Sequence, residues 1–147
     1  MPKVRNIPFI DLSLKKTELD KTISNISKLI KNKNFIGGNE VKNFQENFSK
    51  FNESKYCVGV ANGTDALEIA LESLDIPKNS EVIVPNFTFL SPAEAVVRGG
   101  YKLVLADINL DDFTISIESL KKLATKKTSA LIVVHLFGNP CDMTEIR

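Results

Sequence analysis

The sequence of 147 residues has no tryptophan, two cysteines and a single histidine. Two cysteines, Cys57 and Cys141, are too few for a disulfide framework, and their separation matches no zinc-ligand spacing. We therefore predict no metal site. Free thiols are the default in a reducing compartment, so we expect a cytoplasmic protein.

Signals for membranes, secretion and nucleic acid are also missing. The longest apolar runs, such as residues 130–134, are far shorter than the roughly 20 residues that cross a bilayer. The stretch from Met1 to Phe9 lacks the continuous apolar core of a signal peptide. With 19 basic and 18 acidic residues, the net charge is +1. This balance gives no electrostatic reason to expect a membrane or nucleic acid as a partner.

The composition, 43% hydrophobic and 25% charged, is that of an ordinary globular domain. Apolar residues at helical spacing predict a first helix from Leu14 to about Lys33, with Ser13 as its N-cap. Paired glycines then end the pattern, and a second amphipathic helix is predicted from about Asn39. We expect these leading helices to occupy residues 13–51.

From residue 57 onward the period of the apolar residues changes repeatedly between that of strands and that of helices. Strands are predicted at 57–60, 81–84, 103–106 and 130–134. Helices are predicted after residue 62, at 92–97 and 116–123, and an opening helical turn at 142–147. Alternating strand–helix units over 57–147 indicate an α/β domain with a mostly parallel sheet flanked by helices.

The most informative stretch runs from Gly59 to Leu67, where a glycine turn leads directly into a helix. The first N–H groups of a helix have no partner inside it, and a phosphate fits there. Gly63 lets the backbone approach an anion closely, and Thr64 adds a hydroxyl. The same residues are equally typical of an ordinary helix cap. The stretch is neither a Walker loop nor a dinucleotide fingerprint, which disfavours nucleoside triphosphates and NAD.

A second stretch places Phe87, Thr88 and Phe89 directly after a predicted strand. Ligands of open α/β sheets gather at the carboxyl ends of the strands, where an aromatic ring can stack on a planar heterocycle. Taken alone, such phenylalanines are more often core residues. The single histidine, His135, also ends a predicted strand, and a structural role is favoured over that of a general base.

Together and in this order, the motifs resemble the DegT/DnrJ/StrS family of pyridoxal-phosphate (PLP) enzymes. They are FIGGNEV at 35–41, NGTDAL at 62–67, EVIVP at 81–85 followed by FTF at 87–89, and VHLFG at 134–138. The resemblance covers residues from about Ile7 to Arg147. It implies the large domain of an aspartate-aminotransferase-like fold, truncated at its carboxyl side.

By this resemblance, backbone groups of Gly63, Thr64 and Asp65 hold the PLP phosphate, and Phe89 stacks on the pyridine ring. The lysine of the Schiff base and the acid that pairs with the pyridinium nitrogen lie beyond Arg147 in such proteins. So do the remainder of the large domain and the small carboxyl-terminal domain. We therefore expect no catalytic residue among the 147 residues and no transamination by this chain alone.

The resemblance implies an aminotransferase that moves an amino group, from glutamate, to a nucleotide-linked keto sugar, and that works as a homodimer. Two alternatives stay open. One is a PLP-dependent sugar dehydratase of the same fold, in which histidine replaces the Schiff-base lysine. The other is a non-catalytic module that holds a phosphorylated ligand at Gly63 and Thr64.

Overall fold

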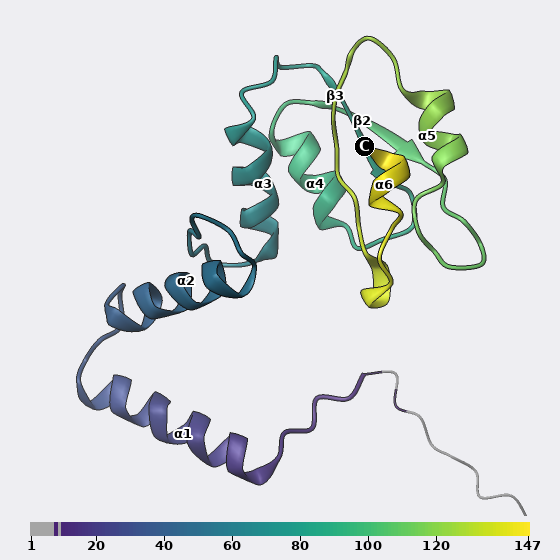
Figure 1. The fold of residues 1–147 in the computed structure, drawn as a ribbon. Helices are drawn as coiled ribbons and strands as arrows, with labels where there is room; N and C mark the ends of the chain where they lie inside the picture. Colours follow the sequence, from purple (N-terminus) through teal and green to yellow (C-terminus); the bar gives the residue numbers. More distant parts are fainter. Residues whose placement is uncertain (1–7, 9) are drawn as a thin grey trace, which may run out of the picture. The chain divides into compact units, whose positions relative to one another are not determined.

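The computed structural model describes residue 8 and residues 10–147, and the chain divides into two compact units, Met1–Gly59 and Val60–Arg147 (Figure 1). The boundary falls inside the predicted second segment, 57–147. Of the stretch from Met1 to Phe9, only Pro8 lies within the described residues. None of the helices in the described part of the chain combines the length and the apolar character that a membrane span requires.

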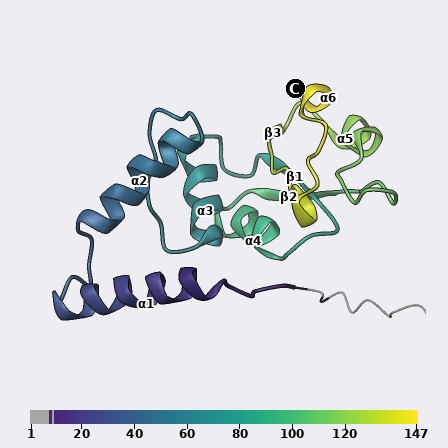
Figure 2. The ribbon, with the colours of Figure 1, turned by 60° about the horizontal axis from the view of Figure 1, so that its bottom comes forward.

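The first unit contains two helices, α1 (Lys16–Lys31) and α2 (Asn39–Phe51), joined by a turn (Figure 2). The prediction that Ser13 caps α1 is wrong, because the N-cap is Lys15. The N–H and the hydroxyl of Ser13 both donate to the carboxylate of Asp11, at 2.9 and 2.6 Å. This local turn occupies the serine side chain three residues before the helix begins.

Helix α2 begins at Asn39, as predicted, because Gly38 before it has φ 96°, a conformation open to glycine. Phe44, Phe48 and Phe51 lie on one side, with neighbouring ring centroids 5.5 and 6.4 Å apart. This spacing is the helical period that the sequence shows.

The predicted strand at 57–60 is wrong. These residues have no strand assignment and no strand partner in the described part of the chain. The N–H of Gly59 donates instead to the side-chain oxygen of Gln45 on α2, at 2.8 Å. A strand is stable only beside a neighbour that accepts its hydrogen bonds, so an apolar run without one stays irregular.

The second unit is built on a three-stranded parallel sheet, which confirms the predicted class. Its strands are β1 (Glu81–Pro85), β2 (Lys102–Ala106) and β3 (Thr128–Leu131), in the order β2-β1-β3. The connecting helices are α3 (Gly63–Ser73), α4 (Ser91–Arg98), α5 (Ile117–Leu123) and α6 (Met143–Ile146), with a short 3-10 turn at Leu136–Gly138.

Strand β3 lies two to three residues earlier than the predicted 130–134. Leu131 pairs with Ile83, and Ile132 still donates its N–H to the carbonyl of Ile83 at 2.9 Å. Continuing this register brings Val133 opposite Pro85, which has no N–H to offer. The ladder therefore ends there, and the chain from 132 to 135 leaves the sheet.

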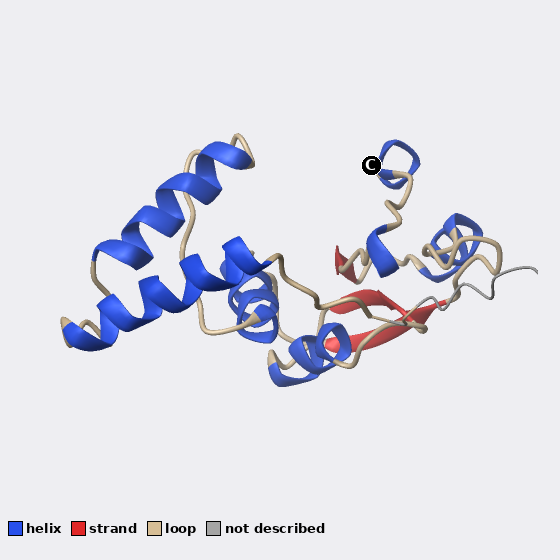
Figure 3. Ribbon diagram, turned by 90° about the horizontal axis from the view of Figure 1, so that it is seen from below, coloured by secondary structure: helices blue, strands red, loops and turns tan. Residues whose placement is uncertain are grey.

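Helices cover both faces of this sheet, as Figures 1 and 3 show for α4 and α5. Val82 and Val84 of β1 point to one face, where they pack with Leu71 of α3 and Val96 of α4. Ile83 points to the other face. Its cluster contains Ala106, Ile115 and Cys141, with Leu120 and Ile146 of α5 and α6 packed against it. The alternation of β1 thus builds two cores from one strand.

At the amino-terminal end of the sheet, the buried carboxylate of Glu81 joins three segments. It accepts hydrogen bonds from the Thr125 hydroxyl at 2.6 Å and from the Lys102 ammonium at 2.9 Å. These bonds, that of Thr125 first, hold the pKa of Glu81 below its ordinary value. A buried carboxylate with satisfied partners ties β1 to β2 and to the turn before β3.

We expect Glu81→Gln to lower stability at neutral pH in the full-length protein, expressed to the stop codon of its reading frame. Because the folded state lowers the pKa of Glu81, the ionised carboxylate stabilises the fold above its ordinary pKa of 4.5. That contribution disappears as the pH falls through the lower, folded-state pKa. Denaturant midpoints between pH 7 and 3 should therefore separate wild type from variant at the top of the range and converge at the bottom. Glu53→Gln, at an exposed position, is the control, and a constant gap would contradict the account.

Candidate functional site

A cavity of about 470 Å³ opens in the second unit, at the carboxyl ends of β1 and β3. Three segments line it: the start of α3, the loop from β1 into α4, and the chain that leaves β3. Its lining residues are Gly63, Thr64, Leu67, Thr88, Phe89, Ser91, Pro92 and 132–135. This end of a parallel sheet is where α/β proteins bind ligands.

The amino-terminal end of α3 provides both a cap and free donors. The side-chain oxygen of Asn62 accepts the N–H of Asp65 at 2.9 Å, so Asn62 is the N-cap. No acceptor for the N–H groups of Gly63 and Thr64 is found among the residues that the structure describes. The two interpretations of this motif are therefore compatible, because the cap uses one donor and leaves two for an anion.

Gly63 is suited to this position by its missing side chain and not by its backbone conformation. Its φ lies outside the left-handed region, and a Cβ built on it would meet no atom within 4 Å. A side chain there would extend into open space beside the unpaired N–H groups. Glycine thus keeps the helix end accessible to a bound group.

Thr64 reaches across the cavity to a residue that sequence reasoning missed. Its hydroxyl oxygen lies 2.7 Å from that of Ser91, the first residue of α4, which is buried. One hydroxyl donates to the other, which leaves one hydroxyl proton free to reach a ligand. A serine directly before Pro92, a proline in the first turn of a helix, was the available signal.

Phe89 borders the cavity with 77% of its surface exposed, and Phe87 is also exposed, so neither belongs to the core. An aromatic ring in this setting is free to stack on a ligand. Asp65 does not line the cavity, and its N–H is bound to Asn62. The structure thus brings Gly63, Thr64 and Phe89 together around one cavity, and Asp65 lies outside its lining.

A smaller cavity of about 320 Å³, which we call the aromatic groove, adjoins the first and shares Thr88 and Phe89 with it. It is lined by Phe87, Thr88, Phe89, Leu136 and Phe137. Phe113 stands behind it, with its ring centroid 5.7 Å from that of Phe87 and 6.4 Å from that of Phe137.

Phe113 and Phe137 have φ angles of 60° and 56°. A bulky residue in the left-handed region costs about 1–3 kcal/mol, and such strain gathers where a structure serves a function.

His135 also borders the cavity of about 470 Å³, and its Nδ1 accepts the N–H of the buried Cys141 at 3.1 Å. In the neutral ring, the proton then lies on Nε2. This bond closes the loop between residues 135 and 141, which supports the structural role favoured from the sequence. Within the described residues, no cluster of histidine, cysteine and acidic side chains could hold a metal ion.

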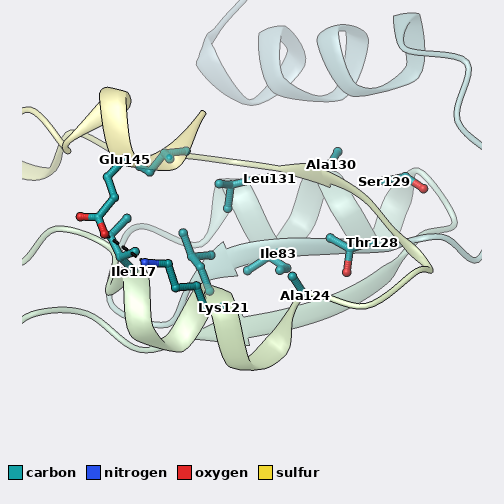
Figure 4. A pocket seen from close by; sticks show the side chains of 11 residues that line it. Ile83, Ile117, Lys121, Ala124, Thr128, Ser129, Ala130, Leu131 and Glu145 are labelled. Atoms are coloured by element: carbon teal, nitrogen blue, oxygen red, sulfur yellow. Dashed lines mark hydrogen bonds and ion pairs between the residues drawn. The ribbon is translucent and has the colours of Figure 1, made fainter.

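A separate cavity of about 390 Å³ lies between α5, α6 and β3 (Figure 4). Its walls are mostly apolar. Its two charged side chains, Lys121 and Glu145, point toward each other and form an ion pair at 3.1 Å. None of the predicted site residues lines it.

The fold is that of PLP-dependent aminotransferases. The X-ray structure of DesV from S. venezuelae in complex with a ketimine intermediate matches with a TM-score of 0.86 and 34% identity, covering 95% of this chain and 38% of that one. The Escherichia coli GDP-4-keto-6-deoxy-D-mannose-3-dehydratase with bound hydrated PLP matches with a TM-score of 0.83 and 29% identity, covering 96% and 37%.

The profile of the DegT/DnrJ/EryC1/StrS aminotransferase family matches residues 16–147, and the chain belongs to this family. The dTDP-3-amino-3,6-dideoxy-alpha-D-galactopyranose transaminase of Aneurinibacillus thermoaerophilus is 35% identical over 141 residues. That match covers 95% of this chain and 39% of the relative, so the chain spans well under half of the relative's length.

His135 offers a test of how the cavity wall is held. His135→Ala should destabilise the full-length protein by about 1–3 kcal/mol, because the buried N–H of Cys141 loses its acceptor. His135→Asn places an amide oxygen close to the position of Nδ1 and should recover most of the loss. Denaturant unfolding of the three proteins measures this, and equal destabilisation by alanine and asparagine would contradict it.

Proposed function

We propose that this chain supplies the phosphate and ring contacts for PLP in an aminotransferase that acts on nucleotide-linked keto sugars. The observation that carries the proposal is the convergence of a helix end with two unpaired N–H groups and an exposed phenylalanine on one cavity. A planar ring that carries a phosphate needs these two kinds of contact. Membership of the family supports the same cofactor.

The residues around the cavity fit PLP, and each can be given a role. The N–H groups of Gly63 and Thr64 bind the phosphate, and the hydroxyl pair of Thr64 and Ser91 donates the remaining proton to it. Phe89 stacks on the ring. Asp65 contributes its backbone N–H when that donor is released from, or shared with, the Asn62 side chain.

PLP supplies an electron sink for the amino-group exchange. The residues of this chain bind and orient it: the helix dipole of α3 favours the phosphate charge, and Phe89 excludes water from one side of the ring. We propose that the Schiff-base lysine and the acid paired with the ring nitrogen lie beyond Arg147.

The amino donor that we propose is glutamate, the acceptor is a nucleotide-linked keto sugar, and the working form is a homodimer in the cytoplasm. The relatives support the acceptor, because their names are those of enzymes of nucleotide-linked amino or deoxy sugars. The donor and the dimer rest on the family resemblance.

The direct test is turnover by the full-length protein. With PLP, glutamate and a dTDP-linked keto sugar, we expect an amino sugar and 2-oxoglutarate in equal amounts, measured by mass spectrometry. The 147-residue chain tested in the same way should give neither product. If the full-length protein has no lysine downstream of Arg147 and binds PLP without turnover, the proposal of an enzyme is wrong and the protein is a binding module.

A sugar dehydratase is the second candidate, favoured by the match to the Escherichia coli 3-dehydratase. The two candidates differ in their product. A dehydratase removes a hydroxyl group and yields a deoxygenated keto sugar with no nitrogen retained. The mass of the product therefore separates them.

Gly63→Ala provides a test of the phosphate contact. The added methyl group meets no protein atom, so we expect unchanged folding, but it occupies the space in front of the unpaired N–H groups. Loss of about 1–2 kcal/mol of anion binding corresponds to roughly 5–30-fold weaker PLP affinity. Spectroscopic titration with PLP measures the affinity, and Ala66→Ser, at an exposed position outside the cavity, is the control. Equal affinity in wild type and Gly63→Ala would remove the α3 end from the phosphate site.

A further inference from the structure

We propose that the pair Asn62 and Gly63 is a deamidation site, at which the protein loses the amide that caps α3 as it ages, and that an anion bound at this end of α3 slows the loss. The part that concerns PLP rests on the proposed function, which supplies PLP as the anion. The inference adds a covalent modification to the helix end and a consequence of that modification for cofactor binding.

The sequence singles out this pair of residues. Asparagine is among the thermolabile residues, and it reacts with the backbone nitrogen of the residue that follows it. Asn62 is the one asparagine of the 147 residues that is followed by glycine. Glycine has no Cβ to shield its nitrogen or to restrict the backbone, so its nitrogen reaches the asparagine side chain more easily than that of a residue with a side chain.

The reaction exchanges bonds at the side chain of Asn62. The backbone nitrogen of Gly63, after losing its proton to water, attacks Cγ of the amide, and the bond from Cγ to Nδ2 breaks. Nδ2 leaves as ammonia, and a cyclic succinimide remains. Water then opens the ring at either carbonyl group, which gives aspartate or isoaspartate at position 62. The net change is the gain of one water molecule and the loss of one ammonia.

The structure leaves both reacting groups accessible. Asn62 and Gly63 are exposed, and the N–H of Gly63 has no acceptor among the residues that the structure describes. A Cβ built on Gly63 would meet no atom within 4 Å, so the space beside this residue is open. Asn62 has φ −160° and ψ 178°, so it precedes the helix and its backbone is not fixed in a helical turn.

Two hydrogen bonds hold the reacting groups back. The side-chain oxygen of Asn62 accepts the N–H of Asp65 at 2.9 Å, and its carbonyl oxygen accepts that of Ala66 at 3.1 Å. Closing the ring turns the side chain towards Gly63 and rotates the backbone of Asn62, so both bonds have to open. Such opening is frequent at an exposed helix end. A ligand that binds only the closed first turn of α3 therefore lowers the rate.

The product changes the charge of the anion site. A carboxylate at position 62 still caps α3 and is favourable at the amino terminus of a helix, so the fold is retained. It also lies beside the N–H groups of Gly63 and Thr64, where its charge repels a phosphate. An isoaspartate lengthens the backbone by one carbon and moves these donors. Deamidated protein should therefore bind PLP several-fold more weakly.

Asn79 provides a reference within the same chain. The residue after it is Ser80, which is buried and whose N–H donates to the carbonyl of Pro77 at 3.1 Å. The nitrogen that would have to attack is thus paired, and it belongs to a residue with a side chain. We expect Asn79 to keep its amide. Trypsin separates the two asparagines into the peptides 56–78 and 79–98.

The test is ageing of the full-length protein at mildly alkaline pH without ligand, with inorganic phosphate and with PLP. Mass spectrometry of the two tryptic peptides measures aspartate and isoaspartate over time. Without ligand, we expect peptide 56–78 to convert several times faster than peptide 79–98. Phosphate at roughly ten times its Kd should slow this conversion about tenfold, and saturating PLP should slow it as well.

Two variants assign the consequence to the charge. Asn62→Asp introduces the carboxylate directly, and Asn62→Ser keeps a capping oxygen without a charge. Spectroscopic titration should give a several-fold weaker PLP affinity for Asn62→Asp than for Asn62→Ser.

The outcomes separate this inference from the proposed function. If peptide 56–78 converts no faster than peptide 79–98, or equally fast with and without phosphate, the inference is wrong. Equal PLP affinity of Asn62→Asp and Asn62→Ser overturns its consequence for the cofactor. Failure of the full-length protein to bind PLP overturns the proposed function alone, because the ligand-free and phosphate samples still decide whether Asn62 is the deamidation site.

Discussion

Strand β1 is buried along all five of its residues because it pairs with β2 on one side and β3 on the other, while its two faces enter two separate cores. A strand without an exposed face has to be apolar throughout, and only its first residue, Glu81, departs from this rule. The parallel pairing has a functional consequence. It sends the carboxyl ends of both outer strands to the edge where β1 ends, so the loops that follow them meet at one place. The cavity lies where the chain that leaves β1 and the chain that leaves β3 meet the start of α3.

The site is held by one contact between residues close in sequence and one between residues far apart. The cap on α3 is local, since Asn62 and Asp65 are three residues apart. The bond between Thr64 and Ser91 joins positions 27 residues apart and depends on α3 and α4 packing side by side. The position of the Thr64 hydroxyl at the helix end therefore depends on the packing of α4, because its partner Ser91 is a buried residue of α4. The glutamate at the opposite end of the sheet stabilises the same three-strand arrangement without approaching the cavity.

The features that sequence reasoning predicted well are those set within a few residues. Helix α2 starts after a glycine pair, and β1 is a short run of branched residues before a proline. The motif at Gly63 predicts a helix that starts there, and α3 does. One error is local, because Asp11 accepts the hydrogen bonds of Ser13 and the cap of α1 is Lys15 instead. The other errors lie where a distant partner decides. Residues 57–60 have strand composition but no neighbouring strand within residues 10–147, and β3 ends early because Pro85 lies in its register. Ser91 was missed for the same reason, because its importance comes from Thr64. The aromatic groove draws on two segments, 87–89 and 136–137, which are brought together only by the fold.

Phe89, like Thr88, lines both the cavity at the start of α3 and the aromatic groove, and its ring is the aromatic group that the two share. Under the proposed function one face of this ring contacts the planar heterocycle, while the ring also lines the groove. Substituting Phe89 would disturb both contacts at once, and its effect could not be assigned to either. Phe137 borders the groove alone, and Gly63 borders the cavity alone. Gly63 begins α3 and Phe137 lies in the 3-10 turn, and neither the cavity nor the groove is lined by both. The changes in free energy of PLP binding should therefore add in a double variant of these two residues, whereas either change combined with one at Phe89 should not add.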